Sequence, residues 1–228
     1  IHNISGRIVG FGGRTLRTDK KVAKYQNSPE SEIYSKSREI YGLYFAKKAI
    51  QQQNYAIMVE GYTDVISMHQ SGVENVVASS GTSLTTEQIR LLSRFTKNIT
   101  VMYDGDSAGQ HASLRGIDMI LKEGLNVRVV LLPVEHDPDS FARSHSAEEV
   151  REYIKQNSQD FISYKAKLLL ADAGNDPIKR SEVVRDIVQS IAEIPDTIQR
   201  SFYIKECAQL MSMSEDLLVT EVAKRRVN

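Results

Sequence analysis

The chain has 228 residues, of which 41% are hydrophobic and 25% are charged, and its 29 Lys and Arg residues balance 29 Asp and Glu residues. This composition is typical of a globular protein and excludes a low-complexity chain. A single cysteine, Cys207, excludes an intrachain disulfide and a thiolate zinc cluster, which favours a reducing compartment. No apolar run approaches the roughly 20 residues of a membrane span, so we expect a cytoplasmic protein with no membrane partner.

The neutral net charge hides an uneven distribution along the chain. Residues 1–50 contain ten Lys or Arg and four Asp or Glu, whereas residues 51–145 contain seven and eleven. A basic segment followed by an acidic one is typical of a site that holds a polyanion beside metal-binding carboxylates. Two solvated faces would give the same counts, so composition leaves both interpretations open.

The first fifty residues carry two structural signals. Residues 4–18 alternate apolar and polar side chains around GFGG and predict a short hairpin or irregular strand pair. A basic loop is expected to follow, from Arg14 to Ser31. Residues 35–53 then carry apolar side chains at helical spacing after a serine cap, and we predict a helix there.

From Tyr55 the pattern changes to short apolar runs separated by helix-length segments. The runs begin near residues 55, 75, 98 and 127, and their continuous apolar character indicates strands that are buried on both faces. Amphipathic spacing over 62–71, 85–95 and 107–123 supplies the intervening helices. Repeated βαβ units of this kind predict an α/β fold with a central, mainly parallel sheet.

Beyond about residue 146 the sequence contains no further strand candidate. Helical patterns cover 146–156, 158–173, 177–193, 195–211 and 214–226, so the tail is predicted to be a small helical bundle. Cys207 lies among apolar neighbours in this tail and is expected in its core. The chain is therefore divided into a basic amino-terminal segment (1–54), an α/β domain (55–145) and a helical subdomain (146–228).

Six carboxylates follow three of the predicted strands, and the carboxyl ends of parallel strands meet at one edge of a sheet. Oxygen ligands without His or Cys favour Mg²⁺ or Mn²⁺ over zinc. Two such ions can clamp the attacking and leaving oxygens of a phosphoryl transfer, and a glutamate beside them can bind metal or move a proton. The six are Glu60 and Asp64 after the first strand, Asp104 and Asp106 after the third, and Asp137 and Asp139 after the fourth.

Each acidic group also has a purely structural interpretation. The D-G-D and D-P-D sequences occur in ordinary turns, and Glu60 or its neighbours Thr63 and Asp64 can cap the following helix. The joint placement of all six at three strand ends favours a metal-dependent phosphate site.

Two further segments suit phosphate contact. SSGTSLT (79–85) offers backbone amides and hydroxyls to an anion, or it is an N-capped turn. KKVAKYQNSPE (20–30) mixes lysines with residues that stack on bases, or it is merely a solvated loop. The five histidines match no zinc or triad spacing, and no GxxxxGK[ST] phosphate loop is present.

Four motifs in a fixed order resemble the Toprim catalytic domain: EGYTD (60–64), VASSGTSLT (77–85), YDGDSAG (103–109) and HDPDS (136–140). The upstream sequences GRIVGFGGRTL, KYQNSPES and YSKSREIYGLY, within residues 6–44, narrow the resemblance to bacterial DnaG-type DNA primases. The resemblance covers about residues 6–145, and the helical tail is similar in character to the closing subdomain of the primase polymerase core.

The resemblance implies an enzyme that joins ribonucleoside triphosphates into a short RNA primer on a single-stranded DNA template at the bacterial replication fork. It implies that Glu60 acts as general acid or base or as a metal ligand. It also implies that Asp104 and Asp106, with Asp64, Asp137 and Asp139 alongside, hold Mg²⁺ or Mn²⁺. Basic positions that line the template and nucleotide path correspond to Arg14, Lys24 and Lys36, and Tyr25, Asn27 and Ser28 lie in the same family motif.

The resemblance is incomplete at both ends. The start at Ile1 suggests a fragment of a longer protein, and the family's amino-terminal zinc module finds no Cys and His cluster here, so no zinc is expected. The domain that docks on the replicative helicase is also expected to be missing. Two alternatives stay open: another Toprim enzyme, such as a nuclease or topoisomerase fragment, and a non-catalytic nucleic-acid-binding module.

Overall fold

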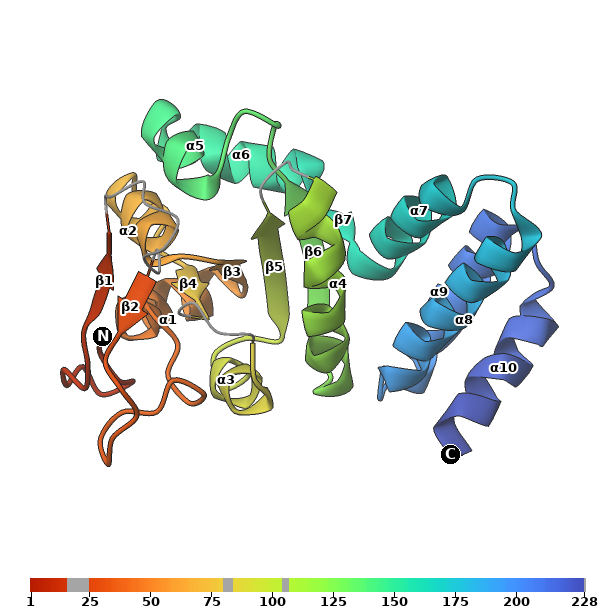
Figure 1. The fold of residues 1–228 in the computed structure, drawn as a ribbon, viewed down its shortest axis with the longest axis horizontal. Coiled ribbons are helices and arrows are strands. Elements are labelled where there is room, and N and C mark those ends of the chain that lie inside the picture. Colours follow the sequence, from red (N-terminus) through yellow and green to blue (C-terminus); the bar gives the residue numbers. More distant parts are fainter. Residues whose placement is uncertain (16–24, 80–83, 104–106, 228) are drawn as a thin grey trace.

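The computed structural model describes residues 1–15, 25–79, 84–103 and 107–227. Its centre is a five-stranded sheet in the order β4-β3-β5-β6-β7 (Figure 1). The strands β3 (Ala56–Val59), β4 (Val76–Ala78), β5 (Asn98–Tyr103) and β6 (Asn126–Leu131) run parallel, which confirms the four predicted strands.

One strand of this sheet was not predicted. β7 (Gln159–Asp160) pairs antiparallel with β6 through Arg128↔Asp160 and Val129↔Gln159, so the expectation of no strand beyond residue 146 is wrong. These two residues are polar and carry none of the β-branched pattern that marks a strand in sequence. Their pairing depends on the chain returning to the open edge of β6.

Side chains that alternate along the strands enter two separate cores, one on each face of the sheet, as expected for strands buried on both faces. Ala56 and Met58 point into a cluster shared with α1 (Leu43–Gln53), α3 (Thr86–Leu92) and α4 (Ser107–Lys122). Ile57 and Val59 point into a second cluster with α2 (Tyr62–Gln70), α5 (Pro138–Ser144) and α6 (Ala147–Asn157). The three predicted crossover helices are therefore confirmed as α2, α3 and α4.

The predicted helix over 35–53 begins only at Leu43, and the predicted serine cap is wrong. Gly42 occupies the N-cap position with φ 83°, where an L side chain is strained and a Cβ would lie 2.8 Å from Val65 Cγ1. Just before it, Tyr41 exchanges two backbone hydrogen bonds with Ala78, at 2.9 and 3.1 Å. Pairing with the sheet therefore holds this segment out of the helix.

The amino-terminal segment forms a two-stranded antiparallel ribbon. β1 (Gly12–Arg14) pairs with β2 (Tyr25–Asn27), with Gly12 opposite Asn27. The first strand lies where a hairpin was predicted, but its partner lies inside the predicted basic loop rather than within residues 4–18. The polar sequence of β2 gave no strand signal, because its pairing with β1 rather than its composition makes it extended. We call this pair the β1–β2 ribbon.

The helical tail follows the prediction closely. Its helices after α6 are α7 (Phe161–Ala173), α8 (Pro177–Glu193), α9 (Thr197–Met211) and α10 (Glu215–Val227). Ser146, Asp160, Asp176 and Asp196 accept backbone hydrogen bonds as N-caps of α6 to α9, which is what short polar side chains do at helix starts. Cys207 is buried in this core, as expected, and burial raises the pKa of its thiol to about 12.

The tail is joined to the sheet by a continuous apolar core and by one buried ammonium group. Lys165 of α7 is 2% exposed, and its Nζ lies 3.2 Å from Asp118 of α4 and 3.2 Å from Asp186 of α8. It also donates to the Ser190 hydroxyl at 2.7 Å. Three helices therefore converge on one charge that has protein partners in place of water. Among the described residues, no helix combines the length and apolar character needed to cross a membrane.

We predict that Lys165→Ala lowers the free energy of unfolding by about 3 kcal/mol, because it removes the shared cation and leaves two carboxylates close together. This loss of stability is at the low end of the range for breaking a buried ion pair, because the side chains of Asp118 and Asp186 remain 26% and 49% exposed. Urea unfolding measures it. Lys167→Ala, at an exposed position of the same helix, is the control and should change stability by less than about 0.5 kcal/mol. Equal effects of the two substitutions would contradict this role.

Candidate functional site

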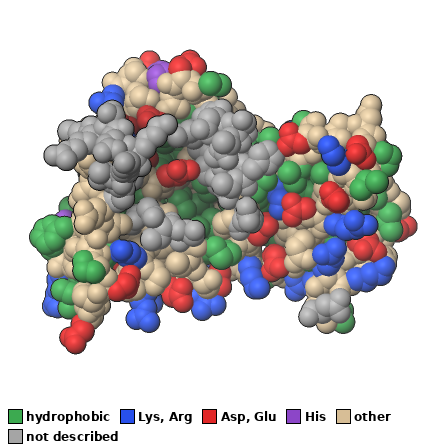
Figure 2. All heavy atoms as spheres, in the orientation of Figure 1, with side chains coloured by type: hydrophobic (Ala, Val, Ile, Leu, Met, Phe, Trp, Pro, Cys, Tyr) green, Lys and Arg blue, Asp and Glu red, His purple; other side chains and the backbone are tan. Residues whose placement is uncertain are grey.

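The carboxyl edge of the sheet begins where β3 ends. Val59 closes this strand and Glu60 follows it with an exposed side chain. β5, paired directly with β3, ends at Tyr103, and α4 begins at Ser107. Asp104 and Asp106 lie between these two points, outside the described residues. Figure 2 shows Asp or Glu side chains near the middle of the larger part of the molecule, away from the tail.

Asp64 has a structural partner. Its Oδ2 accepts a hydrogen bond from the Gly61 backbone N–H at 2.9 Å, which closes the first turn of α2. The helix-capping alternative considered for this motif therefore applies to Asp64. The Glu60 side chain makes no hydrogen bond or ion pair within the described part of the chain, which leaves its carboxylate to the solvent at the strand end.

Asp137 and Asp139 lie at the start of α5, where a turn after the fourth strand was expected. Asp137 accepts from the Ser140 backbone N–H at 2.8 Å as the N-cap. Partial burial acts to raise the pKa of this carboxyl, but hydrogen bonds from Ser140 outweigh it and hold the pKa below its usual value. Asp139 accepts from the Ser67 hydroxyl on α2 and pairs with Arg143 at 3.0 Å.

Three of the six predicted carboxylates thus hold local structure, and each of these three lies on α2 or at the start of α5, which pack together. Within the described ranges, no three His, Cys, Asp or Glu side chains gather closely enough to hold a metal ion. Asp104 and Asp106 are not among the residues searched. Of the described acidic group, Glu60 is the member whose carboxylate remains available at the strand end.

The β1–β2 ribbon meets the same edge through Asn27. Tyr62, the first residue of α2, donates from its hydroxyl to Asn27 Oδ1 at 2.6 Å. Ser28 continues the ribbon, since its backbone N–H donates to Phe11 O and its hydroxyl accepts from Phe11 N–H, both at 2.9 Å. The structure therefore brings Asn27 and Ser28 to the edge where Glu60 lies.

The other four residues predicted to contact the template or nucleotide are Arg14, Lys24, Tyr25 and Lys36. Arg14 lies opposite Tyr25 in the ribbon and has an exposed side chain. Tyr25 is the first residue of β2, and Lys24 lies outside the described residues. Lys36 is held by its backbone: its N–H donates to Glu30 at 2.8 Å and its carbonyl accepts from Gln88 Nε2 at 3.0 Å.

The segment 79–85 is described only at its ends, because residues 80–83 lie outside the described ranges. At its carboxyl end Thr85 is the N-cap of α3, and its hydroxyl accepts from the Gln88 backbone N–H at 3.2 Å. In return, the Thr85 backbone N–H donates to Gln88 Oε1 at 3.1 Å. The N-capped turn considered for this segment is therefore present at Thr85, and anion binding by the preceding residues remains a prediction.

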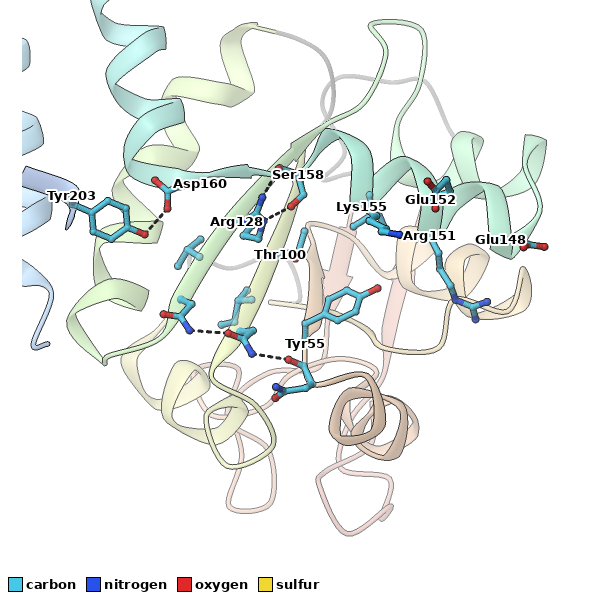
Figure 3. A pocket seen from close by; sticks show the side chains of 16 residues that line it. Tyr55, Thr100, Arg128, Glu148, Arg151, Glu152, Lys155, Ser158, Asp160 and Tyr203 are labelled. Carbon is cyan, nitrogen blue, oxygen red and sulfur yellow. Dashed lines mark hydrogen bonds between the residues drawn. The ribbon is translucent and has the colours of Figure 1, made fainter. Parts of the chain in front are cut away.

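A pocket of about 850 Å³ lies at the opposite, amino ends of the strands, beneath α6 (Figure 3). Its charges are balanced: Arg128, Arg151 and Lys155 face it together with Glu148, Glu152 and Asp160. Several of these groups already have partners, as in the hydrogen bond at 2.6 Å from the Arg128 guanidinium to Ser158 O. Parallel sheets bind ligands at the carboxyl ends of their strands, so this pocket is not the candidate site.

Sequence reasoning missed Tyr62. Its helical spacing marks it as a core residue, and it is 7% exposed, but its hydroxyl reaches the ribbon as well. The signal was its position two residues after Glu60 within EGYTD, where a polar group on a buried ring needs a partner.

Comparison with known proteins identifies three family profiles along the chain. The DNA primase catalytic core, N-terminal domain, matches residues 1–47, a Toprim-like domain matches residues 57–142, and the DnaB-helicase binding domain of primase matches residues 164–216. The last match overturns the expectation that the helicase-docking domain is missing. It covers most of α7 through α9, which had been predicted as helices without any distinguishing motif.

Individual relatives agree with these profiles. DNA primase of Halalkalibacterium halodurans is 38% identical over 97% of this chain, and that of Aquifex aeolicus is 44% identical over 71%. The chain spans 37% and 32% of those proteins, respectively.

Solved structures give the same result. A DNA primase domain from Pseudomonas aeruginosa superposes with a TM-score of 0.85 at 31% identity, over 100% of this chain and 70% of that one. A DnaG primase catalytic domain bound to single-stranded DNA superposes with a TM-score of 0.82 at 31% identity, over 95% and 69%. The agreement confirms the predicted α/β core with its helical tail.

The capping role of Asp137 gives a testable prediction. Asp137→Ala should lower the free energy of unfolding at pH 7 by about 1 kcal/mol, whereas Asp137→Ser, which keeps a capping oxygen, should cost a few tenths of that. Because the pKa is lowered in the folded state, the contribution is present above the unfolded pKa of about 3.9 and is lost as pH falls through the folded value. The gap between wild type and Asp137→Ala in urea unfolding should therefore narrow at pH 3. A constant gap would contradict the assignment.

Proposed function

The chain belongs to the DnaG-type DNA primases, and we propose that it forms the RNA-polymerising core of such an enzyme, joining ribonucleoside triphosphates into a short RNA primer on single-stranded DNA during replication in the bacterial cytoplasm. The observation that carries this proposal is the meeting of two parts at one sheet edge. The ribbon residue Asn27 is hydrogen bonded to Tyr62, two residues after Glu60. Template contacts and phosphate chemistry are thereby assigned to one place.

We assign the metal-binding role to Asp104 and Asp106, with Glu60 beside them as the general base. The direct pairing of β3 with β5 supports this, because residue 104 follows the last residue of β5 and Glu60 follows the last residue of β3. These ligands offer only oxygen atoms, which suits Mg²⁺ or Mn²⁺. Bound there, the cations neutralise charge on the triphosphate and lower the pKa of the attacking hydroxyl.

Side chains of the protein supply the proton acceptor and the contacts to phosphates and template. Glu60 is exposed at the strand end and accepts the proton of the primer 3′-hydroxyl as that oxygen bonds to the α-phosphorus and pyrophosphate leaves. Arg14, Lys24 and Lys36 hold phosphates of template and nucleotide, and Tyr25, Asn27 and Ser28 contact the template beside them. Asp64, Asp137 and Asp139 supply negative potential around the site while they keep their structural hydrogen bonds.

We further propose that the tail contacts the replicative helicase. The support is the profile match over residues 164–216, which names DnaB-helicase binding. On the face that Figure 2 shows, Lys or Arg and Asp or Glu side chains are interspersed over the tail, with hydrophobic side chains among them. Lys165 ties this region to α4, the helix that follows residues 104–106 in the chain.

A calorimetric titration tests the polymerising site. We expect this chain to bind ATP in the presence of Mn²⁺, and Asp104→Ala to weaken that binding at least about tenfold, because a cation held there would lose one of its carboxylate ligands. Glu182→Ala, which removes an exposed carboxylate on α8, is the control and should bind as wild type does. Unchanged metal-dependent ATP binding in Asp104→Ala would refute the site, and absence of any Mn²⁺ or ATP binding by wild type would favour a non-catalytic module.

A further inference from the structure

Tyr62 occupies the position that links the predicted catalytic glutamate to the ribbon. It is the first residue of α2, and Gly61 before it is fixed by the hydrogen bond to Asp64 at 2.9 Å. Its ring is 7% exposed. The backbone at Tyr62 is therefore set at a fixed place relative to Glu60, only two residues away.

The ribbon contacts the Tyr62 ring at a paired position of its two strands. Gly12 and Asn27 lie opposite each other in the two strands. The Tyr62 hydroxyl donates to Asn27 Oδ1 at 2.6 Å, while a Cβ placed on Gly12 would lie 2.8 Å from Tyr62 Cε2 and 3.2 Å from Asn27 Oδ1. Glycine at position 12 is thus required by the close approach of the ring to the strand.

A second tyrosine holds the ring from another side. The centroids of Tyr41 and Tyr62 are 4.4 Å apart with an interplanar angle of 61°, an edge-on contact. Tyr41 is itself anchored to the sheet, because its backbone pairs with Ala78 at the end of β4. The Tyr62 ring therefore has little room to turn, and its hydroxyl direction is determined by packing.

We propose that Tyr62 is a positioning residue: it fixes the β1–β2 ribbon, and with it the Asn27 amide, at a set distance from Glu60. This rests on the proposed function, in which Asn27 contacts the template and Glu60 serves the reacting phosphate. The hydrogen bond from the Tyr62 hydroxyl to Asn27 Oδ1 fixes which way the amide is turned. Loss of the hydroxyl frees the amide to rotate and the ribbon to shift.

A purely structural role for Tyr62 makes a different prediction. If the ring only fills the core, Tyr62→Phe keeps the packing and changes nothing. If the edge as a whole depends on the hydroxyl, Tyr62→Phe lowers thermal stability and Mn²⁺ binding together with template binding. Positioning of the ribbon alone predicts weaker binding of single-stranded DNA with Mn²⁺ affinity unchanged and stability lowered only by the contribution of one hydrogen bond.

The experiment measures three quantities on this chain. They are the dissociation constant for a fluorescent single-stranded DNA oligonucleotide by anisotropy, the Mn²⁺ affinity by calorimetry, and the thermal unfolding midpoint. For Tyr62→Phe we expect DNA affinity to fall about three- to tenfold, with Mn²⁺ affinity unchanged and the unfolding midpoint lowered only by the small contribution of one hydrogen bond. Tyr41→Phe is the matched control, because that hydroxyl makes no hydrogen bond within the described part of the chain.

A second pair of variants approaches the contact from the ribbon. Gly12→Ala places a methyl group against the Tyr62 ring and should reproduce the loss of DNA affinity, whereas Gly13→Ala meets nothing closer than Gln26 O at 4.0 Å and should bind as wild type does. Wild-type DNA affinity in both Tyr62→Phe and Gly12→Ala would overturn the inference, as would parallel losses of stability and Mn²⁺ binding. Absence of DNA and Mn²⁺ binding by wild type would instead refute the proposed function on which it rests.

Discussion

The parallel pairing of β3 with β5 is the constraint on which the rest of the structure depends. The two strands are in parallel register, with Ala56, Ile57 and Met58 opposite Ile99, Thr100 and Val101. Both strands therefore end at the same edge of the sheet. Glu60 emerges there from the first strand, and Asp104 follows the second in the chain. A shift of one residue would turn buried Ile57 and Val59 to the wrong core, which fixes this register strongly.

The ribbon and the tail lie differently with respect to that edge. The ribbon reaches it from outside through Gly12, Asn27 and Tyr62, with small contacts that set a distance. The tail packs away from it through a broad apolar core and the shared ammonium of Lys165. A basic amino-terminal region and a helical tail, far apart in the sequence, are thereby joined to one sheet.

The sheet and helices were predictable because continuous apolar runs and helical periodicity are local signals. β7, the late start of α1 at Leu43 and the pairing partner of β1 were not, because each depends on a backbone that arrives from elsewhere: β6, Ala78 and β2. The predicted end of the first strand placed Glu60 at the sheet edge, as observed, and its role in a site stays a prediction. Sequence alone could not reveal that Asp64 and Asp137 cap helices, since a capping aspartate and a metal-binding aspartate share the same residue type and the same position after a strand.

The most direct test of this account is anomalous diffraction from crystals of the chain grown with Mn²⁺ and a ribonucleoside triphosphate. We expect a manganese peak at the carboxyl ends of β3 and β5, with the Glu60 carboxylate and residues 104 and 106 around it and the triphosphate beside the ribbon. A peak confined to Asp137 and Asp139, or triphosphate bound in the pocket beneath α6, would contradict it.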